Sequence, residues 1–176
     1  AGPIGLAAIA TLHDRRVDDV VAVDLEQRRL AVARELGARD VVRPGEADLW
    51  DALGALHGRD RFYWMDIVGT SVFIEATGSG ALLADVIARA GPGARISVVA
   101  LHRKPVAVDF MTVMMKQLTL QGAMEYPERY ETMLELLARR DLRPMITHRF
   151  GLDEFAEAFA VASTPDAGAK VMIRIE

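Results

Sequence analysis

The stretch Ala1-Gly2-Pro3-Ile4-Gly5-Leu6 opens the chain and decides which fold to expect. Gly2 and Gly5 match the second and third glycines of the G-x-G-x-x-G turn, which joins a strand to a helix and binds a pyrophosphate. Pro3 has a φ angle suited to a first helical turn. The N–H groups that follow it would lie at the positive end of the helix dipole, where anions bind. The alternative is an ordinary Gly/Pro turn before an alanine-rich helix.

A β-branched run, Val20-Val21-Ala22-Val23, follows the predicted first helix and ends at Asp24. Such a run is typical of a parallel strand that is covered on both faces. In a dinucleotide fold, a carboxylate at this place accepts hydrogen bonds from the adenosine ribose and repels a 2′-phosphate, which favours NAD over NADP. The alternative is that Asp24 caps the next helix, and both interpretations can hold together. The combination of glycine turn, helix, strand and terminal Asp predicts dinucleotide binding.

Helical and strand patterns alternate along the rest of the chain. Helices are predicted at 25–36, 47–57, 81–90, 110–116, 128–140 and 153–162, and strands at 40–42, 72–74, 95–101, 106–108, 118–122 and 170–175. This order predicts βαβ units and hence an α/β fold with a Rossmann-type, doubly wound parallel sheet. Residues 58–69 follow neither pattern, and we expect a loop that folds its aromatic side chains against the core, with ligand stacking as the alternative. Leu152 and Phe155 are expected to point inward.

The composition narrows the possible functions. A chain of 176 residues corresponds to about one domain. Its net charge of −4, with both signs interspersed, argues against a nucleic-acid or membrane-surface partner. We find neither an apolar run long enough for a transmembrane helix nor the pattern of a signal peptide. The chain has no cysteine, which excludes disulfides and thiolate metal sites within it and favours the reducing cytoplasm.

Several motifs carry a resemblance to one family. They include the opening Gly2-Pro3-Ile4-Gly5-Leu6, then Val23-Asp24-Leu25, Ile74-Glu75-Ala76-Thr77-Gly78 and Gly168-Ala169-Lys170-Val171-Met172-Ile173. Together they resemble the medium-chain zinc-dependent alcohol dehydrogenase superfamily, nearest its polyol branch of sorbitol, threonine and butanediol dehydrogenases. The resemblance implies hydride transfer between a secondary alcohol or polyol and NAD. It covers only the cofactor-binding half of such an enzyme, as an NAD-binding domain at 1–145 and a segment at 146–176 that returns to the catalytic domain.

The resemblance also implies which residues contact the cofactor. Gly2, Pro3, Ile4 and Gly5 would meet the pyrophosphate, Asp24 and Arg29 the adenosine ribose, Ala76 and Thr77 the adenine side, Val99, Ala100 and Leu101 the nicotinamide ribose and carboxamide, Ala123 and Glu125 the carboxamide, and Lys170 the pyrophosphate. Ala100 replaces a glycine that is common there. No catalytic or metal-ligating residue is assigned within the chain. His102 is expected to be a solvated loop histidine rather than an acid–base catalyst.

The family's catalytic zinc and the fold's first strand both belong before the glycine turn. The resemblance therefore implies zinc in an N-terminal domain outside this chain, where the metal acts as a Lewis acid. We expect the chain to be a fragment of a longer protein and to be inactive alone.

Residues 105–121 resemble the segment through which these dehydrogenases pair as homodimers or tetramers. An edge strand at 106–108 and a helix with Phe110, Met111, Met114 and Met115 would meet their two-fold copies. The alternative is a methionine-filled core patch.

Three other functions stay open at this point. The first is a zinc-free quinone or enoyl reductase of the same superfamily, which Asp24 disfavours because those relatives commonly use NADPH. The second is a non-catalytic nucleotide-binding module. The third is a purely structural α/β fragment, which measurable NAD affinity would exclude.

Overall fold

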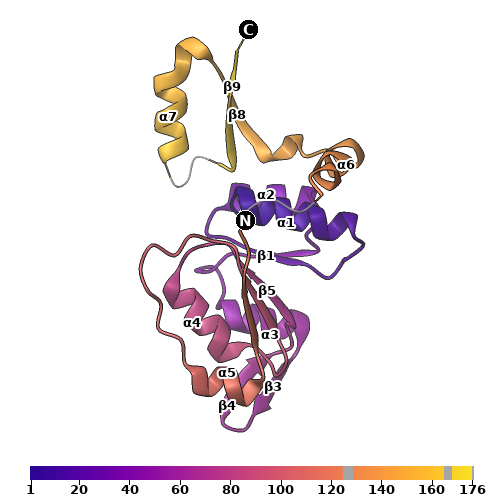
Figure 1. The fold of residues 1–176 in the computed structure, drawn as a ribbon, viewed down its shortest axis with the longest axis vertical. Coiled ribbons are helices and arrows are strands. Elements are labelled where there is room, and N and C mark those ends of the chain that lie inside the picture. Colours follow the sequence, from indigo (N-terminus) through magenta and orange to yellow (C-terminus); the bar gives the residue numbers. More distant parts are fainter. Residues whose placement is uncertain (125–128, 165–167, 176) are drawn as a thin grey trace. The chain divides into compact units, whose positions relative to one another are not determined.

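The computed structural model describes residues 1–124, 129–164 and 168–175, and it divides into two compact units. Unit 1 comprises residues 1–46 and 126–176, and unit 2 comprises residues 47–125 (Figure 1). Unit 1 contains α1 (Pro3–Asp14), β1 (Val21–Val23), α2 (Gln27–Glu35), β2 (Asp40–Val42), α6 (Glu131–Arg139), η1 (Arg143–Met145), β8 (Ile146–Gly151), η2 (Leu152–Glu154), α7 (Phe155–Ser163) and β9 (Lys170–Arg174). Unit 2 contains α3 (Leu49–His57), β3 (Arg59–Phe62), β4 (Met65–Val68), β5 (Val72–Glu75), α4 (Gly80–Arg89), β6 (Arg95–Val98), α5 (Phe110–Lys116) and β7 (Thr119–Gly122).

Parallel pairing dominates the strands, as the alternating order of helices and strands predicted. Strand β1 pairs with β2, β6 lies between β5 and β7, and β8 pairs with β9, all in parallel. Within the described residues these pairings form separate sheets. The predicted α/β class with parallel strands is confirmed, although β8 was not among the predicted strands. In Figure 1, α7 lies alongside the β8–β9 pair, which it also contacts.

The segment that we expected to be an irregular loop is instead a β-hairpin. Strands β3 and β4 pair antiparallel, with Phe62 opposite Met65, and Tyr63 makes the turn with a positive φ of 55°. The side chains of Tyr63 and Trp64 are 71% and 65% exposed, so the expectation that the aromatics fold against the core is wrong. The sequence did not predict this hairpin because its turn has no Asn or Gly and its strands contain several charged residues.

The core of unit 1 forms where α1 and α2 cover β1. Leu6 and Ile9 of α1 pack with Ala22 of β1 and with Leu30 and Ala33 of α2. Leu6, Leu30 and Ala33 are at most 1% exposed. Burial of such side chains contributes about 1.5–3 kcal/mol each for the larger ones, so this cluster fixes the start of α1 beside the end of β1.

The core of unit 2 forms between α4 and its parallel sheet. Leu83, Val86 and Ile87 of α4 pack with Ile96 of β6, and Leu118 closes the cluster before β7. Side-chain oxygens begin the helices of this unit, as in α4, where the Ser79 hydroxyl accepts a hydrogen bond from the Leu82 amide. The sheet thus packs against one face of α4, and loops follow the ends of its strands.

Two other local expectations are wrong. Residues 106–108, which the structure describes, form no strand, because Val106 and Val108 pack against the core of unit 2 instead. Leu152 and Phe155, expected to point inward, are 60% and 56% exposed.

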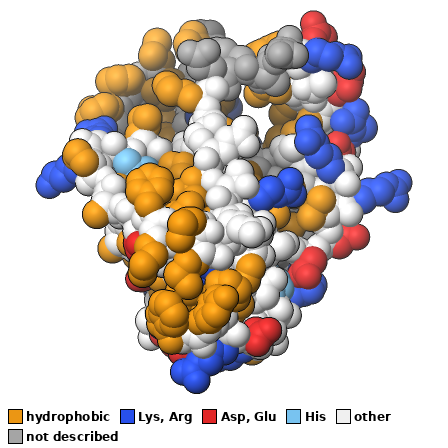
Figure 2. All heavy atoms as spheres, turned by 60° about the horizontal axis from the view of Figure 1, so that its bottom comes forward, with side chains coloured by type: hydrophobic (Ala, Val, Ile, Leu, Met, Phe, Trp, Pro, Cys, Tyr) orange, Lys and Arg blue, Asp and Glu red, His pale blue; other side chains and the backbone are white. Residues whose placement is uncertain are grey.

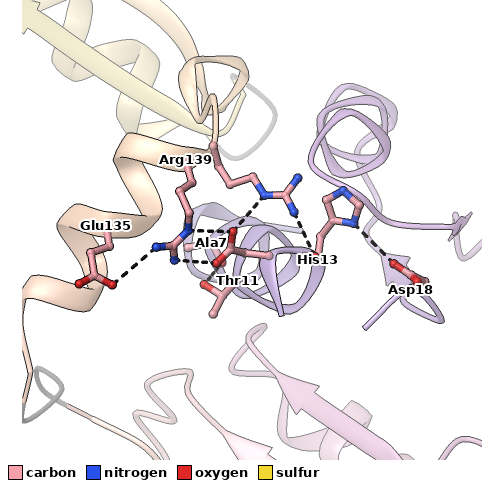
Figure 3. Close-up of polar contacts among 8 residues, drawn as sticks. Ala7, Thr11, His13, Asp18, Glu135 and Arg139 are labelled. Atoms are coloured by element: carbon pink, nitrogen blue, oxygen red, sulfur yellow. Dashed lines mark hydrogen bonds and ion pairs between the residues drawn. The ribbon is translucent and has the colours of Figure 1, made fainter. Parts of the chain in front are cut away.

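A cluster of ion pairs joins the C-terminal end of α1 to the end of α6 within unit 1 (Figure 3). The Asp14 carboxylate accepts hydrogen bonds from Arg139 at 2.9 Å and from Arg140 at 3.2 Å. Arg139 also lies 3.6 Å from Glu135 one turn earlier on α6. The hydrogen bond from Arg139 is the main influence that lowers the pKa of Asp14, and Arg140 adds to it.

Asp14→Asn is expected to lower the thermal stability of the protein at pH 7. Because the pKa of Asp14 is lower in the folded state than its ordinary 3.8, its contribution is present above pH 3.8 and is lost as the pH falls through the folded value. Melting temperatures measured at pH 7, 5 and 3 should differ equally between wild type and variant at the first two pH values and should differ less at pH 3. Glu135→Gln is the matched control and should change little, since exposed pairs contribute little. An Asp14→Asn effect no larger than that of the control would contradict the prediction.

Candidate functional site

The glycine turn leads directly into α1, as predicted. Gly2 is the N-cap with an extended backbone, and Pro3 occupies the first helical turn. The amide of Leu6 donates the first helical hydrogen bond, to the Gly2 carbonyl at 2.9 Å, so the N–H groups of Ile4 and Gly5 precede the helical bonding pattern. A Cβ built on Gly2 would have no neighbour within 4 Å. The turn thus presents backbone donors beside open space.

Asp24 lies at the end of β1, next to this turn. The amine of Ala1 donates to the Val23 carbonyl at 3.1 Å and contacts the Asp24 carboxylate at 2.9 Å. The other carboxylate oxygen accepts the Glu26 amide at 2.9 Å. Asp24 is therefore not the helix cap, because the N-cap of α2 is Glu26, and it forms instead a local turn that leads into α2.

The environment of Asp24 keeps its carboxylate ionised. Burial alone would raise the pKa of Asp24, but the hydrogen bonds that the carboxylate accepts from the Ala1 nitrogen and the Glu26 amide, together with the charge of Arg29, outweigh burial and lower the pKa. At neutral pH the side chain is an anion that only accepts hydrogen bonds. It suits a ligand with paired hydroxyl groups and repels one with a phosphate there.

Arg29 connects this site to the C-terminal part of unit 1. Its Nε donates to the Gly168 carbonyl at 3.1 Å, and its guanidinium lies 3.8 Å from the Asp24 carboxylate. Lys170, the first residue of β9, is exposed two positions beyond Gly168. The structure thus brings Gly168, two positions before the predicted Lys170, into contact with the predicted Arg29 on unit 1.

On unit 2, the predicted residues follow the ends of adjacent parallel strands. Ala76 and Thr77 follow β5, and the stretch 99–101 follows β6. The amides of Val99 and Ala100 both donate to the Glu75 carbonyl, at 2.9 and 3.2 Å. Ala123 follows β7 and donates to the Val98 carbonyl at 3.0 Å, whereas the predicted Glu125 lies outside the described residues.

Glu75, to which the sequence assigned no role, accepts hydrogen bonds from residues of both the loop after β5 and the loop after β6. One carboxylate oxygen accepts hydrogen bonds from the Thr77 amide and hydroxyl and from the Gly78 amide. The other lies 2.7 Å from Nε2 of His102. The expectation of a solvated His102 is wrong, because its side chain is only 13% exposed. The available signal was an acidic residue that closes an otherwise apolar strand.

The described residues contain neither a cluster of metal ligands nor a membrane-spanning helix. In residues 1–124, 129–164 and 168–175, no three His, Asp or Glu side chains gather in a way that would hold a metal ion. No helix in the described part of the chain is long and apolar enough to cross a membrane.

Comparison with known proteins places the chain in one family. The family model of zinc-binding dehydrogenases matches residues 3–139. An L-threonine 3-dehydrogenase from Deinococcus deserti is 31% identical over 180 residues, which cover 98% of this chain and 49% of that protein. The chain spans about half the length of the curated relatives it matches.

Solved structures share the fold of this chain. The 2R,3R-butanediol dehydrogenase from Bacillus subtilis has a TM-score of 0.83 at 24% identity, and the match covers 99% of this chain and 49% of that one. An alcohol dehydrogenase from E. coli CFT073, complexed with NADH, has a TM-score of 0.83 at 22% identity, with 99% and 50% covered. These likenesses confirm a Rossmann-type fold of the dehydrogenase kind.

Proposed function

This chain belongs to the zinc-binding dehydrogenase family, and we propose that it is the cofactor-binding part of an enzyme that transfers hydride between a secondary alcohol or polyol and NAD. The observation that carries the proposal is the position of Asp24. Its ionised carboxylate lies beside the start of α1, where backbone N–H groups face open space. In one nucleotide the pyrophosphate needs the N–H groups and the neighbouring ribose needs the carboxylate, so the two features must lie side by side.

The pyrophosphate would bind at the start of α1. Gly2, Pro3, Ile4 and Gly5 form the turn and first helical residues there. An anion gains from the N–H groups and from the positive end of the helix dipole. No atom of the described residues lies within 4 Å of a Cβ built on Gly2, so these residues leave room for a phosphate to approach the backbone. We also assign Lys170 to the pyrophosphate, since an ammonium group commonly binds phosphate.

The adenosine ribose would bind to Asp24. Each carboxylate oxygen has two acceptor positions, and the contacts described above use one at each oxygen in this structure. One acceptor position per oxygen is left for the two ribose hydroxyls. Arg29, which is held near Asp24, would border the same ribose or the adenine.

The remaining cofactor contacts are proposed on unit 2. Loops at the carboxyl ends of parallel strands are where ligands bind in open α/β sheets. We assign Ala76 and Thr77 to the adenine side, the stretch 99–101 to the nicotinamide ribose and carboxamide, and Ala123 with Glu125 to the carboxamide. The division into an NAD-binding domain at 1–145 and a closing segment at 146–176 is part of the same proposal.

The reaction itself is proposed for a longer parent protein. Zinc, bound outside these residues, would polarise the alcohol or carbonyl oxygen as a Lewis acid. The small-molecule alcohol or ketone would be selected by that same outside part. Cytoplasmic location is proposed from the absence of cysteine.

The test combines three measurements on the protein purified from its native cells: intact mass, bound zinc and cofactor affinity. The expected result is a mass well above 19.3 kDa, zinc in the same sample, and tighter binding of NADH than of NADPH. A preference for NADPH without zinc would favour a quinone or enoyl reductase. NAD binding with no turnover of any alcohol would favour a nucleotide-binding module, and no NAD binding would overturn the proposal.

We also propose that residues 105–121 form a homodimer or tetramer interface. Phe110, Met111 and Met114 of α5 are 73%, 58% and 68% exposed, which favours an interface over a core patch. Figure 2 shows hydrophobic side chains gathered on the surface that it brings forward. Clusters of exposed apolar side chains of this kind mark interaction sites.

Met114→Glu is expected to shift the protein from dimer to monomer, because it places a charge within an apolar contact. Sedimentation velocity measures the change. Met133→Glu, on α6 and 41% exposed, is the control and should leave the dimer intact. A wild type that is monomeric at all concentrations would refute the interface.

A further inference from the structure

The carboxylate of Glu75 is buried, and each of its two oxygens accepts at least one hydrogen bond. Its side chain is 2% exposed. Burial alone would raise the pKa of Glu75, but hydrogen bonds from Thr77, His102 and the Gly78 amide outweigh it, and the pKa lies below its ordinary value. The group is therefore an anion, and Nε2 of His102 must carry the proton of their shared hydrogen bond. A buried anion with this many donors holds each donor in place.

Glu75 fastens two loops that are far apart in sequence. One carboxylate oxygen organises the turn at 77–78 after β5. The other holds His102, which follows β6 and lies 27 positions along the chain. The Glu75 carbonyl also accepts the amides of Val99 and Ala100. One residue thus ties the ends of two neighbouring strands together.

The two loops approach each other closely at Gly78. This residue has a φ of +73°, and a Cβ built on it would lie 3.1 Å from the Leu101 carbonyl oxygen. Such a contact leaves a side chain little room. A side chain at position 78 would therefore press against the backbone of the second loop.

Packing alone does not hold the second loop. Leu101 is 74% exposed, and Arg103 and Lys104 are exposed as well. Residues 101–109 have no regular secondary structure. His102 is the half-buried residue of the run 101–105, whose other members are exposed, and its bond to Glu75 anchors the loop next to β6.

We propose that Glu75 and His102 are a positioning pair that fixes the loop at 99–102 for the nicotinamide half of the cofactor. The inference rests on the proposed function, because it takes the stretch 99–101 as the nicotinamide contact. The pair acts through the loop and touches neither the hydride nor the substrate. Loss of His102 affects the nicotinamide half and spares the adenosine half, because the turn at Thr77 and Gly78 stays bound to the other carboxylate oxygen of Glu75.

The test compares NADH with ADP-ribose, which lacks nicotinamide, on the full chain. His102→Phe is expected to weaken NADH binding about tenfold, the effect of losing one charge-assisted hydrogen bond. ADP-ribose affinity should stay within about twofold of the wild type, a range that corresponds to less than half of that effect. The emission of bound nicotinamide should also move toward that of free NADH. His102→Gln, whose amide still donates to Glu75, should restore NADH affinity. If His102→Phe does not fold, His102→Ala takes its place with the same expectation.

Three results would overturn the inference. Equal weakening of NADH and ADP-ribose would mean that the pair has only a general structural role. Unchanged NADH affinity in His102→Phe would mean that the loop needs no anchor. A wild type that binds ADP-ribose but not NADH would refute the assigned nicotinamide contact, whereas a wild type that binds neither would refute the proposed function itself.

Discussion

Asp24→Ala is expected to weaken NADH binding about 10- to 100-fold, as the loss of charge-assisted hydrogen bonds to both ribose hydroxyls predicts. The variant should also lose most of its discrimination against NADPH, because the anion that repels a 2′-phosphate is gone. Arg29 would then face the phosphate without the carboxylate beside it. Isothermal titration calorimetry with both cofactors measures the two effects.

Asp24→Asn separates the charge from the local structure. The amide oxygen of Asn can still accept the Glu26 amide, so the turn into α2 is retained. We expect NADPH affinity to rise relative to NADH affinity in this variant as well, with a smaller loss of NADH binding. Unchanged affinity for both cofactors in Asp24→Ala would refute the ribose assignment.

Lys116→Ala is expected to lower the free energy of unfolding by about 3 kcal/mol, the usual loss when a large buried side chain is truncated. The Lys116 side chain is 0% exposed. Its ammonium donates to the Ala88 carbonyl at 2.6 Å and to the Ile87 carbonyl at 3.4 Å, where α4 ends. Truncation leaves both a cavity and unsatisfied helix carbonyls. Urea unfolding followed by circular dichroism measures the loss.

Lys116→Met separates the packing from the charge. Burial lowers the pKa of Lys116, and the charge of Arg89 lowers it further, so keeping the ammonium charged costs free energy. Met fills a similar volume without that penalty, and we expect a loss of only about 1 kcal/mol. Lys104→Ala, at an exposed position, should change stability by less than about 0.5 kcal/mol. A Lys116→Ala variant as stable as the wild type would contradict the role of this lysine.

The elements that sequence patterns predicted well are those that depend on near neighbours. The glycine turn and α1, the β-branched strand before Asp24, and helix α5 all lie where expected. Cap residues such as Ser79 act within three residues of themselves, and the alternation of helices and strands restricts the fold to parallel βαβ units. Similarity in these local motifs was also sufficient to identify the family.

The features that the sequence did not reveal depend on partners distant in the chain. The hairpin around Tyr63 has no turn residue that marks it, and residues 106–108 pack on a core whose other members come from α4 and β6. Hydrogen bonds between residues far apart in sequence are equally hidden, as the bond from Arg29 to the Gly168 carbonyl illustrates at a separation of 139 positions.

The sequence by itself determined the fold class, the glycine turn that begins α1 and the acidic residue beside it, because backbone preferences and hydrophobic periodicity act over a few residues. Only the tertiary structure decided that Glu75 holds His102 and that the Lys116 ammonium donates to the last carbonyls of α4. Each of these contacts forms when separate strands or helices pack together, and the burial that makes a charged group depend on its partner exists only after that packing.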